Sequence, residues 1–415
     1  MGRNAKERRS PAPWPVEKVE VNERHIGRRT VLFFVCLTVA LTSLGYGVYM
    51  LLSAEPGWTR IESGGSGFST EEDFTFEYLV SQGGLSGSDE LRQVRGLYTQ
   101  LLANAHMLFS ADVQLKEPDV HNMWYINSHP NEEIEVDPLL YQAFSMLEEA
   151  GNRGVYLGPV YELYTDLFFA QDAHEAALLD PWQDPDMGRF CQEAADYAQS
   201  PNQVNVELLG ENRLCLRVSE EYRRFVEENG ATKYVDFYRQ KNAFILDYFV
   251  EELAKAGFQE GVLSSADGCV RCLPGTSAGT VFNLLDWRQD QAVAAAQAPF
   301  DQPVALVYMR SFPVGERDQG WYQPVEEGVF RHPYVDIADG RCRAAARSLA
   351  VYAPKGSCAQ LMLAAEPVFI AQDLDLAALS GCKALAVTGE SQILSTDKEQ
   401  RLENIYKGYS RKDVP

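Results

Sequence analysis

The segment Lys233-Tyr-Val-Asp-Phe-Tyr-Arg-Gln-Lys-Asn-Ala-Phe-Ile-Leu-Asp247 decides how we expect this chain to fold. With the helical residues after it and Val262-Leu-Ser-Ser-Ala-Asp-Gly268, it predicts a strand, a tight turn, a helix and a second strand. In many proteins this arrangement presents a phosphate or nucleotide at the turn, where glycines let the backbone approach the ligand. Here the turn carries Tyr238 and Arg239. The segment therefore predicts a familiar scaffold whose ligand site is altered or closed.

The charges of the chain are divided sharply along its 415 residues, which together have a formal net charge of −22. Residues 1–29 hold eight Lys and Arg against four Glu, residues 30–54 hold no charged residue, and the rest is strongly acidic. An acidic surface repels phosphate backbones and anionic lipid headgroups. We therefore expect no nucleic-acid partner, and the simplest reason for the acidity is solubility outside the cell.

Residues 30–54 form an uncharged apolar stretch that is longer than the roughly 20 residues a membrane-spanning helix needs. Arg28 and Arg29 precede it, so the positive-inside rule predicts a cytoplasmic tail over residues 1–29. A cleaved signal peptide is the alternative, but Leu52-Ser53-Ala54 fits a cleavage site poorly. We expect a single-pass anchor in the lipid bilayer of the cell membrane, with the remainder of the chain extracellular.

The extracellular part divides by composition into a Gly/Ser-rich flexible linker over 55–72, a folded domain over 73–390 and a charged, loosely ordered tail over 391–415. Strand-like alternation at 74–80, amphipathic helical patterns at 90–109 and 137–151, and a hairpin pattern at 204–218 lie within the domain. Strands and helices do not alternate strictly. This mixture predicts the α+β class.

Seven of the eight cysteines lie in the predicted extracellular part, so at least one is unpaired within the chain. Cys269 and Cys272 have the CxxC spacing of redox and metal sites. Their surroundings alternate as in a strand, where residues three apart point to opposite faces. We therefore expect buried apolar cysteines rather than a redox or zinc site.

Four blocks of sequence carry a resemblance to a known family. Pro118–Asn127 resembles the motif S-E-I/V-S-R-L/I-N, and Leu147–Tyr164 resembles T-G/D-G-A-F-D-P-T-V-G-P-L-V/Y-x-L-W. Val235–Asp247 lies on V-D-L-G-G-I-A-K-G-Y-A-V-D, and Arg331–Gly340 lies on Y-H-H-I-I-D-P-R-T-G. The last block continues into Val351–Ala364, which resembles V-x-A-P-x-A-x-x-A-D-A-L-A-T.

Taken in order, these blocks resemble the FAD:protein FMN transferases, the ApbE family, over roughly residues 74–379. The resemblance implies an ApbE-like α+β fold of mixed sheets with flanking helices, in an exported or membrane-anchored protein. It also implies FAD and Mg²⁺ as cofactors and a Thr of a membrane redox protein as the acceptor of FMN.

The departures from the family concentrate where its chemistry resides. Gln360 and Ala364 stand at the positions of the Asp and Thr that help to hold magnesium, which prefers hard anionic oxygens. Tyr238 and Arg239 replace the paired glycines, and Asn242 replaces the lysine. Tyr125 and Pro333 likewise stand for the family's Arg and second His. The coupled loss of these positions favours a homologue without the transferase chemistry.

Seven residues remain as candidates for a site. Lys241, His332 and Asp336 are the catalytic candidates, and Asp236, Arg239, Asp247 and Asp267 are the cofactor-binding candidates. Each also fits a structural role, as a helix cap, an ion pair, a loop residue or a turn device.

Three functions follow from this pattern. The first is a membrane-anchored ApbE-like pseudoenzyme that retains a flavin-, nucleotide- or partner-binding role. The second is an active FMN transferase in which Asp336, Asp339 or Asp267 holds magnesium and Lys241 supplies the lysine function. The third is a cell-surface interaction domain without a ligand.

Overall fold

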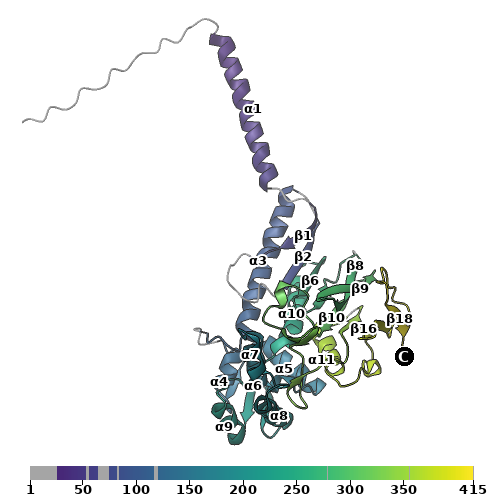
Figure 1. Ribbon diagram of the computed structural model, residues 1–415. Helices are drawn as coiled ribbons and strands as arrows, with labels where there is room; N and C mark the ends of the chain where they lie inside the picture. Colours follow the sequence, from purple (N-terminus) through teal and green to yellow (C-terminus); the bar gives the residue numbers. More distant parts are fainter. Residues whose placement is uncertain are drawn as a thin grey trace, which may run out of the picture.

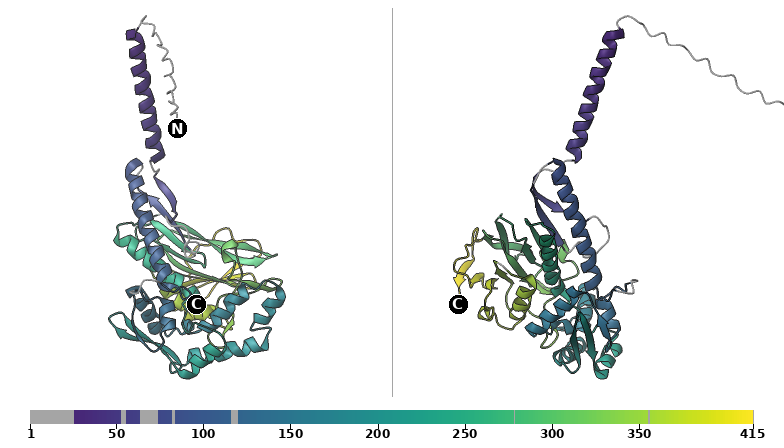
Figure 2. Two further views of the ribbon diagram at one scale, coloured as in Figure 1. Left: turned by 90° about the vertical axis from the view of Figure 1, so that its left-hand side faces the viewer. Right: turned by 180° about the vertical axis from the view of Figure 1, so that it is seen from behind.

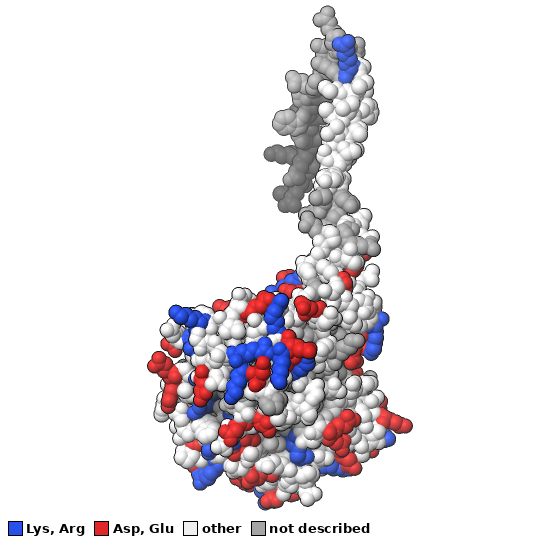
Figure 3. Space-filling view, turned by 90° about the vertical axis from the view of Figure 1, so that its right-hand side faces the viewer, with Lys and Arg blue, Asp and Glu red and all other residues white. Residues whose placement is uncertain are grey.

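The computed structural model describes residues 26–52, 56–63, 74–81, 84–115, 120–277, 279–354 and 356–414 and confirms an α+β fold (Figures 1 and 2). Helix α1 (Ile26–Leu52) projects from the body of the molecule. Its described surface carries no charged side chain along most of its length (Figure 3), and Thr30–Gly47 is long and apolar enough to cross a membrane. Of the cytoplasmic tail predicted over residues 1–29, residues 1–25 lie outside the described part of the chain.

A nine-stranded sheet forms the centre of the domain, and neighbouring strands in it are antiparallel except for the last pair. In spatial order its strands are β1 (Gly57–Ile61), β2 (Phe74–Val80), β6 (Gly261–Ser265), β7 (Cys269–Cys272), β10 (Ala305–Arg310), β15 (Ser348–Ala353), β16 (Lys383–Val387), β17 (Gln392–Ser395) and β18 (Ser410–Asp413).

Two boundaries predicted from composition are wrong. The expected linker over 55–72 contains β1, which pairs along its whole length with β2 and ends at the buried Ile61. The Gly/Ser-rich composition begins only after that strand, at Ser63. The expected tail over 391–415 contributes β17 and β18 to the sheet, because Ile393 is fully buried and its backbone pairs on both sides. The polar and charged residues around Ile393 made this segment look like an exposed tail in the sequence.

The two faces of the sheet are covered by different elements. Helices α3 (Gly84–Phe109), α10 (Lys241–Lys255) and α11 (Cys358–Phe369) pack on one face, and the hairpin β8 (Thr280–Arg288)–β9 (Gln291–Phe300) packs on the other. Cys269 belongs to the helix-side core and Cys272 to the hairpin-side core. Burial raises the pKa of both thiols. The expectation of buried apolar cysteines on opposite faces is confirmed.

The remaining helices gather at the end of the domain farther from α1 (Figures 1 and 2). They are α4 (Met123–Ser128), α5 (Pro138–Ala150), η1 (Gly154–Tyr156), α6 (Gly158–Phe168), α7 (Ala173–Leu179), α8 (Pro185–Gln199) and α9 (Glu220–Glu228). A small sheet accompanies them, in the order β3 (Glu133–Glu135), β5 (Arg213–Val218), β4 (Val204–Gly210). The predicted hairpin is therefore present as β4–β5.

Short elements connect the core strands after β10. They are η3 (Glu316–Asp318), the ribbon β11 (Gln323–Glu326)–β12 (Val329–Arg331), the ribbon β13 (Val335–Asp336)–β14 (Arg341–Cys342) and η4 (Leu376–Ala378).

The deciding segment departs from its prediction in one respect: no strand precedes the turn. The chain enters η2 (Tyr238–Gln240) and α10 directly from an irregular stretch. The buried side chain of Asn127 replaces a neighbouring strand, because its Oδ1 accepts from the amides of Tyr234 and Val235 and its Nδ2 donates to the carbonyl of Val235. Buried backbone groups need such partners, and a side chain 107 residues away in sequence supplies them.

Candidate functional site

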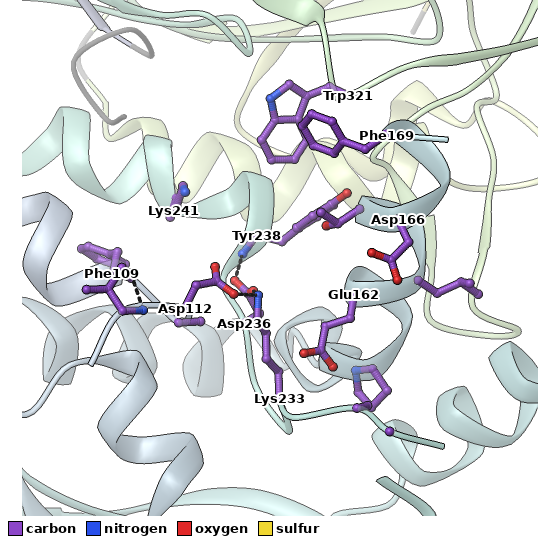
Figure 4. Close-up of a pocket in the computed structure, with 18 of the residues that line it drawn as sticks. Phe109, Asp112, Glu162, Asp166, Phe169, Lys233, Asp236, Tyr238, Lys241 and Trp321 are labelled. Atoms are coloured by element: carbon purple, nitrogen blue, oxygen red, sulfur yellow. Dashed lines mark hydrogen bonds and ion pairs between the residues drawn. The ribbon is translucent and has the colours of Figure 1, made fainter. Parts of the chain in front are cut away.

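A cleft of about 790 Å³ opens beside the deciding segment, and we call it the tyrosine cleft (Figure 4). We define it by Tyr238, Lys241, Glu162, Asp166 and Trp321. In this view Tyr238 lies near the centre with Trp321 above it, Glu162 and Asp166 on α6 lie to the right, and Lys241 lies to the left. Four acidic residues line it, Asp112, Glu162, Asp166 and Asp236, against two lysines, Lys233 and Lys241, and His106.

Tyr238 occupies the turn where the resemblance places a glycine. Its φ is +47°, in the left-handed region, which costs an L-residue roughly 1–2 kcal/mol. Its ring stacks on Tyr161, with centroids 4.3 Å apart and planes 8° apart, and meets the edge of Trp321 at 5.2 Å. Burial raises the pKa of its hydroxyl well above the usual range. The backbone keeps a glycine-type conformation while an aromatic ring fills the space beside it.

Arg239 and Asn242 both face Asp267, in the turn between β6 and β7. The Nδ2 of Asn242 donates to Asp267 Oδ2 at 3.0 Å, and Ser265 Oγ donates to the other oxygen. Arg239 Nε lies 4.0 Å from the same carboxylate, and its guanidinium lies 4.2 Å from the centroid of the Trp321 ring. Arg239 and Asp267 are nearly fully buried, so these two candidates form part of a polar cluster inside the domain.

Asp236 forms a turn and an ion pair at the rim of the tyrosine cleft. It accepts from the amide of Tyr238 at 2.7 Å and from Lys233 Nζ at 3.2 Å, and Lys233 also reaches Asp112 at 2.6 Å. Burial alone would lower the pKa of Lys233, but the two carboxylates outweigh it and raise the pKa above its ordinary value. Lys241 lines the cleft and has no ion pair among the described residues.

Asp247 has a structural role at the start of α11. Its carboxylate accepts from the amides of Cys358 and Ala359, both at 2.9 Å, from Ser357 Oγ and from Arg271. A carboxylate at a helix N-terminus satisfies amides that have no partner within the helix. With its oxygens already bonded, Asp247 has no oxygen left for a cofactor.

His332 and Asp336 lie outside the tyrosine cleft. His332 is buried, and burial together with the charge of Arg331 lowers its pKa from 6.5 to about 3. Asp336 accepts from Ala338 N at 2.9 Å and from Arg343 at 2.7 Å, as a turn residue within an ion pair. The structure therefore does not bring these two residues together with Lys241.

The residues at the family's magnesium positions do not fit the ion. Gln360 is exposed on α11 and offers an amide, and Ala364 offers no ligand atom. Among the described residues, no group of three or more His, Cys, Asp or Glu could hold a metal. The carboxylates proposed as replacements are already engaged: Asp336 and Asp339 pair with Arg343, and Asp267 accepts from Asn242 and Ser265.

The sequence did not single out four residues that lie in or next to the site: Trp321 lines the tyrosine cleft, Tyr161 stacks on Tyr238, and Glu366 and Asn152 contact Gln240 beside them. The Glu366 carboxylate accepts from Asn152 and Gln240. Burial raises the pKa of Glu366 from 4.5 to about 7, and these two hydrogen bonds only partly oppose that rise. Nothing local distinguishes these residues in the sequence, since they come from three separate segments, 152–161, 321 and 366.

Comparisons with known proteins agree with this fold. No protein-family model matches the chain, and no curated protein sequence matches it. An ApbE protein from Thermotoga maritima is structurally similar, with a TM-score of 0.54 and 15% identity, covering 84% of this chain and 96% of that one. The flavin transferase ApbE from Vibrio cholerae has a TM-score of 0.50 and 11% identity, covering 86% and 100%.

The apo flavinyl transferase ApbE from Pseudomonas stutzeri has a TM-score of 0.50 and 12% identity, covering 81% of this chain and 92% of that one. Likeness at these identities concerns the backbone, and a shared fold does not by itself transfer a function. This chain has an ApbE-like fold.

Proposed function

We propose that this protein is an ApbE-fold protein, anchored in the cell membrane by α1, that lacks FMN transferase activity and binds a protein partner in the tyrosine cleft. The observation that carries the proposal is the stacked pair Tyr238–Tyr161. Where the family's glycines would admit a phosphate, this pair fills the space at the turn. In this proposal the folded domain lies outside the cell, as the distribution of Lys and Arg favours.

The loss of transferase chemistry is further supported by the contacts of the charged candidates. Transfer of a phosphoryl-linked group needs cations and donors directed at the developing charge. Arg239 instead faces Asp267 and Trp321, and Asn242 supplies an amide to Asp267. An active transferase with relocated ligands would need carboxylates that are free to bind magnesium.

The chemistry of the cleft favours a basic segment of a partner. Glu162 and Asp166 lie one turn apart on α6 and therefore share a face. The Asp166 carboxylate has no ion-pair or hydrogen-bond partner among the described residues, whereas the Glu162 carboxylate accepts from the amide of Thr232 at 2.9 Å. Phe169, 68% exposed, and Trp321 supply aromatic faces nearby. Carboxylates beside aromatic rings suit Lys or Arg side chains.

A turnover assay tests the central claim. The full-length protein in detergent micelles is incubated with FAD, Mg²⁺ and a membrane redox subunit that carries an acceptor Thr, with the Vibrio cholerae ApbE as the positive control. We expect neither AMP release nor in-gel flavin fluorescence on the target. AMP release together with FMN attached to the target would overturn the proposal.

Peptide binding tests the partner class independently. Fluorescence anisotropy compares a Lys/Arg-rich peptide with its Glu-rich counterpart, on the wild type and on Asp166→Asn. We expect the basic peptide to bind more tightly and Asp166→Asn to weaken it roughly fivefold, the effect of one charge-assisted contact. The matched control is Asp186→Asn, an exposed carboxylate on α8. Equal affinities for wild type and Asp166→Asn would exclude the tyrosine cleft as the binding site.

A further inference from the structure

A second cleft, of about 580 Å³, opens between the end of α7 and the ribbons β11–β12 and β13–β14. We call it the arginine cleft and define it by Trp182, Arg331, His332, Arg343 and Arg347. No Asp or Glu belongs to the described residues that line it. In a chain with a net charge of −22, a cleft lined by three arginines and no acid is unusual.

The carboxylates that pair with these arginines lie outside the lining. Arg331 Nε donates to Asp180, which is fully buried, at 2.8 Å. Arg343 pairs with Asp336 at 2.7 Å and also with Asp339. These ion pairs hold the guanidinium groups of Arg331 and Arg343 in place. Groups held in this way lose little further entropy when a ligand arrives.

Arg347 differs from the other two because no carboxylate among the described residues pairs with it. Among the described residues, its side chain makes one hydrogen bond, a long one from Nη1 to the carbonyl oxygen of Gly328, at 3.4 Å. It is half-buried and lines the cleft. The positive charge of Arg347 is therefore not compensated by a contacting acid.

An aromatic surface lies beside the arginines. Trp182 is 44% exposed, and its Nε1 donates to the carbonyl of Cys342 at 3.3 Å, which fixes the indole. The guanidinium carbons of Arg341, Arg343 and Arg331 lie 5.0, 5.7 and 6.0 Å from its ring centroid. The cleft thus combines fixed cations with a flat apolar surface.

His332 adds a buried polar group to the lining. It is only 4% exposed, and its Nδ1 has no hydrogen-bond partner in the part of the chain that the structure describes. An unpartnered buried polar atom costs stability unless a ligand or water satisfies it. This observation is independent of the arginines and also indicates a ligand.

We propose that the arginine cleft binds a soluble small molecule that carries a phosphate group together with an aromatic part. The planar guanidinium fork matches phosphate oxygens with paired, charge-assisted hydrogen bonds. The aromatic part rests on Trp182, and the volume suits a small organic ligand. This inference does not depend on the function proposed for the tyrosine cleft.

Isothermal titration calorimetry tests the site on the full-length protein in phosphatidylcholine nanodiscs, with phenyl phosphate as the probe. Inorganic phosphate and phenol are the controls for its two halves. We expect phenyl phosphate to bind more tightly than either and Arg347→Gln to weaken it roughly tenfold, as loss of a charged hydrogen-bond donor predicts. The matched control is Arg401→Gln, an exposed arginine paired with Glu403 elsewhere on the domain, which should bind like the wild type.

Two results would overturn the proposal: no heat from phenyl phosphate with the wild type, or unchanged affinity in Arg347→Gln. If that variant melts at a lower temperature, Arg347→Lys replaces it. Lysine keeps the charge and loses the fork, so weaker binding is again expected and equal binding contradicts the proposal. Nanodiscs that also contain phosphatidic acid distinguish the source of the phosphate. Competition by that lipid would assign the site to a lipid headgroup and overturn the soluble ligand.

Discussion

The tyrosine cleft and the arginine cleft lie on the same domain and have opposite chemistry. Among the residues that the structure describes, four acidic residues line the tyrosine cleft and none lines the arginine cleft. The first lies beside the turn where the resemblance to the ApbE family predicts a ligand, and at that turn stacked rings fill the space that the family's glycines would leave open. The second was not predicted from the sequence at all. A shared backbone fold does not by itself preserve a ligand site, because a few different side chains can change the charge and shape of a cleft.

Each cleft also adjoins one titratable group whose pKa burial shifts in favour of the neutral form. Glu366 contacts Gln240, the residue before Lys241, and its pKa is raised to about 7. His332 lines the arginine cleft, and its pKa is lowered to about 3. An acid and a base thus destabilise the protein at opposite ends of the pH range. The predictions below test this contrast.

The largest effect is expected from Tyr238→Ala, which removes the ring that fills the space at the turn beside the tyrosine cleft. Tyr238 is 7% exposed and contacts Tyr161 and Trp321. Deleting a buried aromatic ring lowers the free energy of unfolding by about 4 kcal/mol, which urea denaturation measures. Tyr406→Ala, at a tyrosine 56% exposed, is the control and should cost little. A loss below about 1 kcal/mol for Tyr238→Ala would mean that the ring does not hold the turn.

His332 should make the protein sensitive to acid. Its pKa is 6.5 when unfolded and about 3 when folded, so its contribution is fully present above pH 6.5 and is lost as the pH falls towards 3. Between pH 7 and pH 4 the wild type should therefore lose about 3 kcal/mol more than His332→Gln. The exposed His174→Gln is the matched control. Parallel pH profiles for wild type and His332→Gln would show that this histidine is not held neutral.

Glu366 should act in the opposite direction. Its pKa is 4.5 when unfolded and about 7 when folded, so ionisation of the unfolded chain lowers stability as the pH rises from 4.5 to 7. We expect the wild type to lose about 2 kcal/mol relative to Glu366→Gln over this range, less than the full shift because the residue is only half-buried. Urea denaturation at pH 5 and pH 8 measures it, with the exposed Glu149→Gln as control. A larger loss in the variant would contradict the prediction.

The smallest expected effect is the contribution of the backbone conformation at Tyr238, measured apart from the contribution of its ring. Tyr238→Gly and Tyr238→Ala both remove the ring, but glycine adopts the observed φ of +47° without steric cost. Despite the greater flexibility of its unfolded chain, we expect the glycine variant to be about 1 kcal/mol more stable than the alanine variant. Equal stability, measured by denaturation of the two variants side by side, would indicate that the turn relaxes once the ring is absent.

Much of the fold follows from local patterns. The apolar stretch over 30–54, the α+β mixture and the opposite faces of Cys269 and Cys272 depend on composition and period, which a sequence displays directly. The prediction of a strand before Tyr238 was wrong, because the side chain of Asn127 supplies the hydrogen-bond partners that a neighbouring strand would supply. The strands β1, β17 and β18 were missed because charged or small residues surround them. Pairing partners far away in sequence decide such cases.

For the candidate site, too, some features could be predicted from the sequence and others could not. The sequence by itself determined the acidic charge, the order of the ApbE-like blocks and the replacement of glycines by Tyr238 and Arg239. Only the tertiary structure decided that Tyr238 stacks on Tyr161, that Asp247 caps α11, and that Trp182 meets three arginines from a distant segment. The physical reason is that residue identity sets which interactions are available, whereas packing of distant segments sets which of them form.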